Sequence, residues 1–192
     1  MKKIETIIDK WLTQPEPNAA GRLGLYRIIF AVMYFLLTST SASSFAAMSL
    51  TPSNAWYPTP ILIWMARPPS AEILTALSII NTAALVLLAI GWKVRWATLV
   101  LLISGICIGA LNISVGAHVD HSKVFNHVNI PLLMLFAPWG ETFSLDAVLR
   151  RRRGETSPDP TDDSLRYSWV IKALLWLLAL LFMFGGLVKA FP

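Results

Sequence analysis

Five stretches of the chain are apolar for about the length that a helix needs to cross a lipid bilayer. They cover roughly residues 23–47, 71–91, 94–115, 122–139 and 168–190. Each is close to the roughly 20 residues that span the hydrocarbon core. Inside lipid an open structure must be helical, because only a helix satisfies its own backbone hydrogen-bonding groups. We therefore predict an all-α integral membrane bundle of about five transmembrane helices, which forms a single membrane domain over residues 1–192.

The composition favours the same class. Apolar residues make up 55% of the chain and charged residues only 14%, which is too little polar surface to coat a soluble domain of 192 residues. The net charge is +5, but the basic residues stand between apolar runs and do not follow one amphipathic face. We therefore expect membrane lipid as a partner and exclude nucleic acid.

Two polar segments complete the predicted organisation. Near the N-terminus, apolar residues at helical spacing stand beside lysines, which predicts an amphipathic helix in the membrane surface, with a soluble cap helix as the alternative. The apolar residues are Ile4, Ile7, Ile8, Trp11 and Leu12, and the lysines are Lys2, Lys3 and Lys10. The run 150–166 starts with four arginines and continues with Pro and Asp, so we expect a mobile charged loop.

The connections between spans also carry structural signals. The connection Gly91-Trp92-Lys93-Val94-Arg95 is so short that the second and third spans must form an antiparallel hairpin. Residues 48–70 hold five prolines among Trp and Tyr, a composition typical of an irregular segment at the membrane interface. Pro131 is expected to kink the short fourth span.

Lysine and arginine are distributed unequally between the two sets of connections. With the N-terminus inside, the outer segments hold little beyond Arg67 and Lys123. The positive-inside rule then predicts a cytoplasmic N-terminus and an extracytoplasmic C-terminus in a cell (inner) membrane. Arg27 and Lys172 lie about one turn into the first and fifth spans, where snorkelling to the cytoplasmic surface would accommodate both. For Arg27, an ion pair or hydrogen bonds to neighbouring backbone carbonyls would do the same.

The proton-transfer residues gather on the outer side. His118, His121 and His127 all fall in the segment 116–127, which leads into the fourth span, and Lys189 lies at the outer end of the fifth. A shared crevice without water would favour the neutral amine of Lys189, which can act as a general base while His127 orients the substrate or relays protons. We therefore predict Lys189 and His127 as catalytic residues. A satisfied interfacial histidine and a snorkelling lysine are the structural alternatives.

A metal site is another interpretation of this outer segment. Its ligands would be His118, Asp120, His121 and His127. The spacing matches no known zinc motif, and solvated loop residues explain His118 and His121 equally well. We therefore predict no metal.

Five separated motifs carry a resemblance to a known family. They are Leu23-Gly24-Leu25-Tyr26-Arg27-Ile28, Gly91-Trp92-Lys93-Val94-Arg95, Asn126-His127, Phe143-Ser144-Leu145-Asp146 and Phe184-Gly185-Gly186-Leu187-Val188-Lys189. In their order and spacing the chain resembles, over almost its whole length, the horizontally transferred transmembrane (HTTM) domain family. This domain is the membrane part of vitamin K-dependent gamma-carboxylase and its bacterial relatives. We expect structural roles for Arg27 and Asp146 within these motifs.

The resemblance implies a chemistry. In the carboxylase, a lysine three residues after a glycine of the last motif deprotonates the vitamin K hydroquinone, and Lys189 holds that position after Gly186. A histidine that follows an asparagine also matters there, and Asn126 with His127 matches it. The resemblance thus implies a vitamin K-like hydroquinone as cofactor and chemistry at the non-cytoplasmic face. The carboxylase continues with further spans and a β-rich domain, so peptide carboxylation is expected to need a partner protein that supplies the missing extracytoplasmic domain.

Two functions follow from this reading. The first is a quinone-linked oxidoreductase or carboxylase-like enzyme that binds its substrate between helices, with Asn126, Phe184 and Trp56 in contact with it. The second is a non-catalytic membrane subunit that assembles or matures a partner protein, as HTTM or DoxX-like proteins do; small residues in 39–47 would permit close helix contact. Transport has less support, because no acidic residue lies deep in a span and no inverted repeat is visible.

Overall fold

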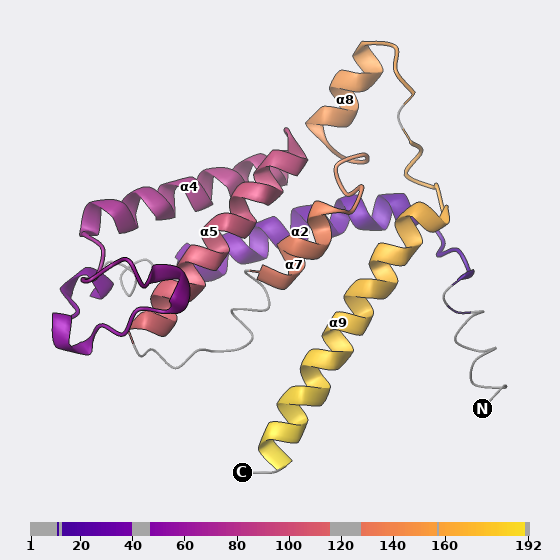
Figure 1. The fold of residues 1–192 in the computed structure, drawn as a ribbon. Helices are drawn as coiled ribbons and strands as arrows, with labels where there is room; N and C mark the ends of the chain where they lie inside the picture. Colours follow the sequence, from indigo (N-terminus) through magenta and orange to yellow (C-terminus); the bar gives the residue numbers. More distant parts are fainter. Residues whose placement is uncertain (1–10, 12, 40–46, 116–127, 157, 191–192) are drawn as a thin grey trace. The chain divides into compact units, whose positions relative to one another are not determined.

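A computed structural model gives the fold of the chain (Figure 1). It describes residues 11, 13–39, 47–115, 128–156 and 158–190, with the backbone alone at 184–185 and 187–190. In this part of the chain all regular structure is helical, which confirms the predicted all-α class. The elements in chain order are α2 (Ala19–Ser39), η1 (Met48–Leu50), η2 (Ser53–Ala55), η3 (Pro60–Leu62), α4 (Ala71–Ile90), α5 (Val94–Ser114), α7 (Ile130–Leu135), α8 (Leu145–Arg152) and α9 (Leu165–Ala190).

Four of the described helices are long and apolar enough to cross a membrane. They are Ala19–Thr38, Ala71–Ile90, Val94–Ser114 and Leu165–Met183, which match the first, second, third and fifth predicted spans. Of the fourth predicted span, 122–139, the structure describes residues 128–139, with α7 preceded by a π-helical turn at 128–129. Pro131 is the second residue of α7 and is buried, and the predicted kink of this span stays a prediction. The predicted surface helix falls mostly on residues outside the described part.

The chain divides into two compact units, which we describe separately. The terminal unit consists of residues up to Tyr26 and from Phe136 onward, and the central unit runs from Arg27 to Leu135. The first turns of α2 therefore belong to the terminal unit and the rest of that helix to the central unit. The single membrane domain over 1–192 stays a prediction.

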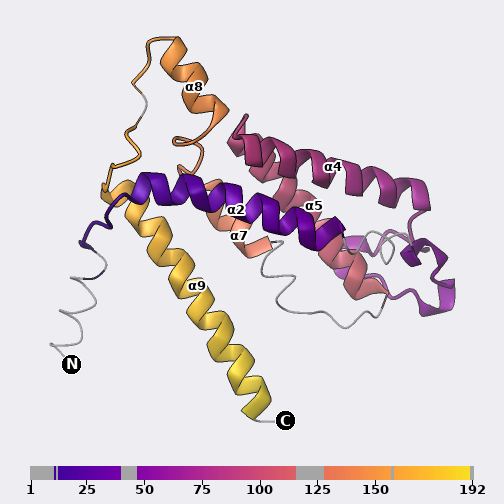
Figure 2. The same ribbon diagram turned by 180° about the vertical axis from the view of Figure 1, so that it is seen from behind.

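The central unit is built on the hairpin of α4 and α5, which lie side by side in both views (Figures 1 and 2). Gly91 follows α4 with a φ of 79°, and its N–H donates to the carbonyls of Leu87 (2.9 Å) and Leu88 (3.2 Å). Glycine closes helices in this left-handed conformation because it has no Cβ to clash. α5 begins at Val94, so the predicted tight hairpin is confirmed.

The interface between α4 and α5 contains a polar contact among its apolar side chains. Ser104 of α5 donates from Oγ to Oδ1 of Asn81 on α4 at 2.9 Å, and both side chains are buried. Hydrogen bonds of this kind join membrane helices because lipid offers no competing water. α7 packs on the same helix α5, so α5 stands at the centre of this unit.

A proline-rich loop, residues 47–70, covers the end of the hairpin opposite to Gly91. It contains η1, η2 and η3 and shares one buried apolar cluster with the start of α4 and the end of α5. The buried members are Trp56, Leu62, Leu74, Ala110 and Leu111. Two backbone contacts attach the loop to α5: the Tyr57 N–H donates to the Ser114 carbonyl (2.9 Å), and the Thr59 N–H donates to Ser114 Oγ (3.1 Å). The loop is irregular, as predicted, and firmly held.

In the terminal unit, the connection between α8 and α9 caps the start of α2. The N–H groups of Ala20 and Gly21 donate to the carbonyls of Asp162 and Pro160, both at 2.9 Å. The first N–H groups of a helix have no partner within the helix, so these two carbonyls supply what the sequence of α2 lacks. The run 150–166, which we predicted to be a mobile loop, thus includes two residues with a defined structural task.

α8 fills the segment before this connection. Its N-cap is Ser144, whose Oγ accepts a hydrogen bond from the Ala147 N–H at 2.9 Å and donates one to the Gly140 carbonyl at 2.6 Å. Asp146 lies in the first turn of α8 and Arg150, Arg151 and Arg152 in its last, the arrangement that the helix dipole favours. α8 therefore starts within the Phe143–Asp146 motif and ends in the arginine run.

Candidate functional site

The two predicted catalytic residues stand differently with respect to the structure. Asn126 and His127 lie outside the described residues, together with His118 and His121. Lys189 belongs to α9, as does Phe184, but their side chains are not among those described. The proximity of His127 and Lys189 therefore stays a prediction. The metal alternative shares the same histidines, and among the described residues no group of three or more His, Cys, Asp or Glu side chains can hold a metal ion.

α9 fixes how far the backbone of Lys189 lies from that of Lys172 along the helix axis. The helix runs without interruption from Leu165 to Ala190. Lys172 and Lys189 are 17 residues apart, which at 1.5 Å per residue is about 26 Å along the helix axis. This is close to the thickness of the hydrocarbon core, about 30 Å. The two lysines therefore stand near opposite ends of one membrane-length helix.

Lys172 is bound within the terminal unit. Its Nζ donates to the backbone carbonyls of Trp11 and Gln14, and the same ammonium lies 5.2 Å from the centroid of the Trp11 ring. The side chain is buried. Our expectation that Lys172 snorkels is wrong, because carbonyl oxygens and an aromatic face replace water around the charge. The result is that the first turns of α9 are tied to the segment that precedes α2.

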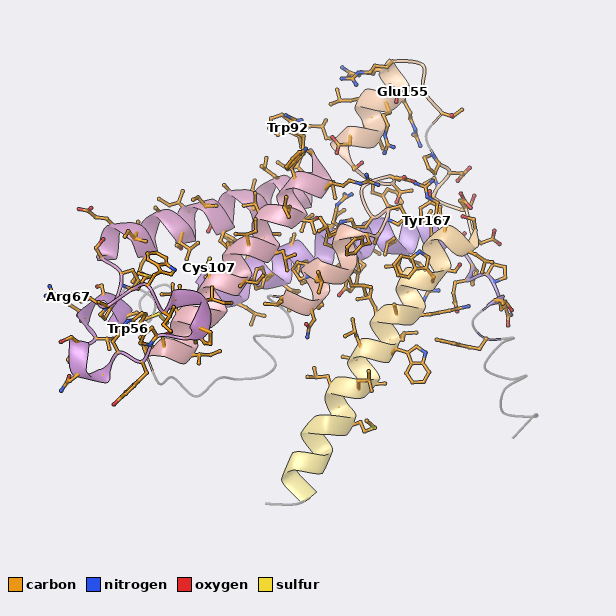
Figure 3. The ribbon with its side chains drawn as sticks, viewed as in Figure 1. Trp56, Arg67, Trp92, Cys107, Glu155 and Tyr167 are labelled. Carbon is orange, nitrogen blue, oxygen red and sulfur yellow. The ribbon has the colours of Figure 1, made fainter. Side chains whose placement is uncertain are left out.

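Further contacts strengthen this anchor. Ser168, also in the first turns of α9, accepts a hydrogen bond on Oγ from the Glu16 N–H at 2.8 Å. Tyr167 donates from its hydroxyl to Oε2 of Glu141 at 2.5 Å, while Arg166 donates to the other carboxylate oxygen. Figure 3 shows Tyr167 at the start of α9. The pattern of apolar residues does not indicate these contacts, because in it Tyr167 is one more aromatic residue. The sequence interpretation therefore missed the cluster of Glu141, Arg166 and Tyr167.

Two glycines bring the start of α2 close to distant segments of the terminal unit. A Cβ on Gly24 would lie 2.4 Å from Oγ1 of Thr142, and a Cβ on Gly21 would lie 2.7 Å from the Pro160 carbonyl oxygen. Thr142 Oγ1 also donates to the Ala20 carbonyl at 2.7 Å. Gly24 belongs to the first family-like motif, and Thr142 directly precedes the motif that begins at Phe143. The two motifs are therefore neighbours in space.

The other predicted site residues are placed as follows. Arg27 is fully buried, so it does not snorkel to water. Asp146 lies half-buried in α8, where its carbonyl accepts a hydrogen bond from Arg150 Nε at 3.3 Å. A structural role for both stays a prediction.

Trp56, predicted to contact substrate, is held inside the proline-rich loop (Figure 3). Its indole Nε1 donates to the Met65 carbonyl at 2.9 Å, and its ring is buried in the apolar cluster with Leu62 and Leu74. These contacts use both the polar and the apolar part of the indole. They give Trp56 a packing role within the loop, and substrate contact stays a prediction.

Comparison of the chain with protein-family models, with curated proteins and with solved structures gives no match.

Proposed function

We propose that this chain is a membrane protein that carries out proton chemistry on a hydroquinone-type substrate at the face of the membrane opposite its arginine run. Lys189 is the base that accepts the phenolic proton, and His127 orients the substrate or relays the proton. Phe184 and Asn126 contribute to the binding site. The observation that carries the proposal is the uninterrupted helix α9, anchored in its first turns through Lys172 and long enough to bring Lys189 to the other face.

The contacts of the terminal unit support this assignment of faces. Ala20 at the start of α2 is bonded to Thr142 and Asp162, and Glu16 is bonded to Ser168 at the start of α9. The starts of α2 and α9 therefore lie at one face. With one crossing each by α2, α4 and α5, which their length and apolar composition allow, the proposed path of the chain reaches the opposite face at Val115. The chain must return before Thr142, so we infer a fifth crossing between residues 115 and 142, which includes α7.

This count has a direct consequence for the proposed site. In this proposed topology the sequence segment that holds the histidines comes after the third crossing and Lys189 at the end of the last one, so we expect both at the face opposite to Ala20. The arginine run follows Thr142 at the face of Ala20, which the positive-inside rule assigns to the cytoplasm. The proposed chemistry is therefore extracytoplasmic. The proposal also draws on the packing of Gly24, in the first family-like motif, against Thr142, which directly precedes the motif that begins at Phe143.

The proposal is tested by hydroquinone turnover. The protein is purified in lipid nanodiscs, bound quinone is identified by mass spectrometry, and the oxidation of vitamin K hydroquinone by added dioxygen, which accepts the two electrons, is followed by fluorescence. Lys189→Ala should lower the rate by about 10²–10⁴-fold, the usual contribution of a general base. Lys93→Asn is the matched control, since it removes a lysine from the hairpin at the other face, and asparagine tolerates the left-handed conformation of Lys93 (φ 47°).

Both variants should keep the thermal stability of the parent protein. Wild-type turnover by a folded Lys189→Ala protein would show that Lys189 is not the base and would contradict the proposal. The non-catalytic subunit is the function that this result would favour, because an assembly role does not need the amine. Equal losses in Lys189→Ala and Lys93→Asn would instead show that the assay responds to overall charge.

A further inference from the structure

The proline-rich loop exposes several large apolar side chains. Five of its side chains form what we call the apolar rim: Leu50, Tyr57, Ile61, Ile63 and Trp64. Their exposed fractions lie between 59% (Ile61) and 81% (Leu50). Leaving an apolar side chain of this size in water costs about 1.5–3 kcal/mol relative to burying it. A rim of five such residues is therefore not what a water-facing loop would display.

The exposure of the rim is built into the loop and does not come from a loose attachment. Trp56 and Leu62, the neighbours of rim residues, point inward and are buried against α4 and α5. The Ser114 contacts of Tyr57 and Thr59 hold the backbone between them. Leu62 is buried while its neighbours Ile61 and Ile63 are exposed, so the conformation that buries Leu62 directs these two side chains outward.

Most backbone N–H groups of this segment have a hydrogen-bond acceptor within the protein, so the segment can enter lipid at little cost. In residues 55–62, the N–H groups of five residues donate to acceptors within the central unit, and two further positions are proline, which has no N–H. The five donors are Ala55, Trp56, Tyr57, Thr59 and Leu62. Trp64 is, with Tyr57, one of the two rim residues with a polar side-chain group. Its indole N–H donates to the Ile61 carbonyl at 3.0 Å. Irregular backbone is tolerated at membrane depth only when its polar groups are satisfied in this way.

The charges of the loop point to the same environment. Residues 48–70 contain no Asp or Glu, and Arg67 is their one basic residue. The rim also continues into the membrane-spanning surface, because Ile73 in the first turn of α4 and Ile113 near the end of α5 are exposed at the same end of the hairpin. Tyr and Trp are the residues that prefer the boundary between headgroups and acyl chains.

We propose that the apolar rim is inserted into the lipid leaflet at this end of the hairpin, with acyl chains as its occupant. The loop then acts as an interfacial wedge that sets the depth of α4 and α5 in the bilayer. Lipid is favoured over a protein partner because the rim joins the lipid-facing sides of two spans and carries no charged residue that would select a protein surface. This inference is independent of the proposed chemistry.

Spin labels measure the depth of the loop directly. In a Cys107→Ala background, which removes the single cysteine, Ile63→Cys carries a nitroxide in vesicles of phosphatidylcholine and phosphatidylglycerol. Collisions with oxygen, which concentrates in lipid, are compared with collisions with a water-soluble nickel chelate. The oxygen-to-nickel ratio at position 63 should exceed that at Asn54→Cys several-fold. Asn54 is the matched control, because it is polar and exposed in η2 of the same loop.

A second label at Ile61→Cys should give the same high ratio, which protects the result against a local effect at one position. A nickel accessibility at position 63 equal to that at Asn54 would place the rim in water and overturn the proposal. Low accessibility to both reagents would also overturn it, because protein would then cover the rim. Repeating that measurement after dilution of the protein with lipid separates a second copy of the chain from a segment of the same chain.

Discussion

Gly24 of α2 lies directly against Thr142, and no methyl group fits between them. A Cβ at Gly24 would come within 2.4 Å of Thr142 Oγ1 and within 2.9 Å of its carbonyl oxygen. The same hydroxyl donates to the Ala20 carbonyl at 2.7 Å, one turn earlier in the helix. The missing side chain of Gly24 is thus the condition for a buried hydrogen bond that joins α2 to the segment before α8.

Gly24→Ala should destabilise the protein by about 1–3 kcal/mol, the usual cost of overfilling a packed contact. Thr142 cannot move away without loss of its hydrogen bond to Ala20, so the clash cannot be relieved without an energetic cost. The measurement is the free energy of unfolding in detergent micelles during titration with a denaturing detergent. A combined Gly24→Ala and Thr142→Ala protein should recover part of the loss, because it removes the nearer of the two clashing oxygens.

Gly109→Ala is the control for this prediction. Gly109 lies in α5, and a Cβ there would meet nothing within 4 Å. Alanine is the better helix former by up to about 1 kcal/mol, so this variant should be as stable as the parent or slightly more stable. A loss in Gly109→Ala equal to that in Gly24→Ala would mean that the Thr142 contact is not the cause.

The elements that the sequence predicted well are those with local causes. The α4–α5 hairpin depends on the length of its apolar runs and on Gly91, and both can be read in one window. Lys172 was predicted to snorkel because its neighbours in sequence say nothing of Trp11 and Gln14, whose carbonyls bind it. Every residue has a backbone carbonyl, so no sequence pattern indicates which carbonyls will bind a distant lysine.

The polar contacts between helices were hidden for a related reason. Glu141 and Tyr167 form a hydrogen bond between segments that are distant in sequence, and neither residue belongs to a motif from which this contact could be predicted. The glycine at position 24 was part of a family-like motif, but its physical reason, the Thr142 contact, became visible only with the fold. The proximity of Lys189 and His127 stays a prediction from the sequence, because His127 and the side chain of Lys189 lie outside the described part of the chain.

Ser104→Ala should weaken the packing of α4 against α5. The change leaves Oδ1 of Asn81 buried without the donor that now lies 2.9 Å away. Hydrogen bonds between membrane helices contribute on average about 0.6 kcal/mol and up to about 1.7. We expect a loss in this range in the free energy of unfolding. Asn81→Ala and the double variant complete a cycle, and purely additive losses would argue that the two side chains do not interact.

Trp56→Phe should separate the packing role of this residue from a role in substrate binding. Phenylalanine keeps an aromatic ring in the apolar cluster but loses the hydrogen bond to the Met65 carbonyl, which is 2.9 Å long. The expected loss of stability is about 1 kcal/mol, against about 3–5 kcal/mol for Trp56→Ala. If Trp56 serves packing alone, quinone binding by the folded Trp56→Phe protein, measured in nanodiscs, should equal that of the parent. A large loss of binding with unchanged stability would favour substrate contact.

The turn that begins at Asp159 should depend on acid pH. The Thr161 N–H and hydroxyl donate to Asp159 Oδ1 at 2.9 and 2.8 Å, and together with the charge of Arg151 they lower the pKa of the carboxyl below its ordinary value of 3.8. The ionised form is favoured in the folded state. Its contribution is therefore complete above pH 3.8 and is lost as the pH falls through the lower folded pKa.

A carbon-13 NMR titration of the Asp159 carboxyl group checks this expectation. Its midpoint should lie below 3.8 in the parent protein. Thr161→Ala should raise that midpoint by part of the difference, because the backbone N–H of residue 161 remains. Arg151→Gln should raise it less, since the arginine acts through charge alone. A parent midpoint at or above 3.8 would contradict the hydrogen bonds that define the turn.

Lys172→Met should destabilise the terminal unit, whereas Lys189→Met should leave stability unchanged. Methionine matches the length and volume of the buried stem of Lys172, so the variant isolates the loss of the ammonium that binds the Trp11 and Gln14 carbonyls. Two buried carbonyls without their donor cost about 1–3 kcal/mol in total, because charged hydrogen bonds are the stronger kind. The expected result is faster proteolysis of the segment before α2 in Lys172→Met alone. At low temperature, where both variants are folded, turnover should be lost in Lys189→Met and kept in Lys172→Met. The reason is that Lys189 is the proposed base, whereas Lys172 only anchors the other end of α9. Equal proteolysis of the two variants would mean that Lys172 does not hold the N-terminal segment.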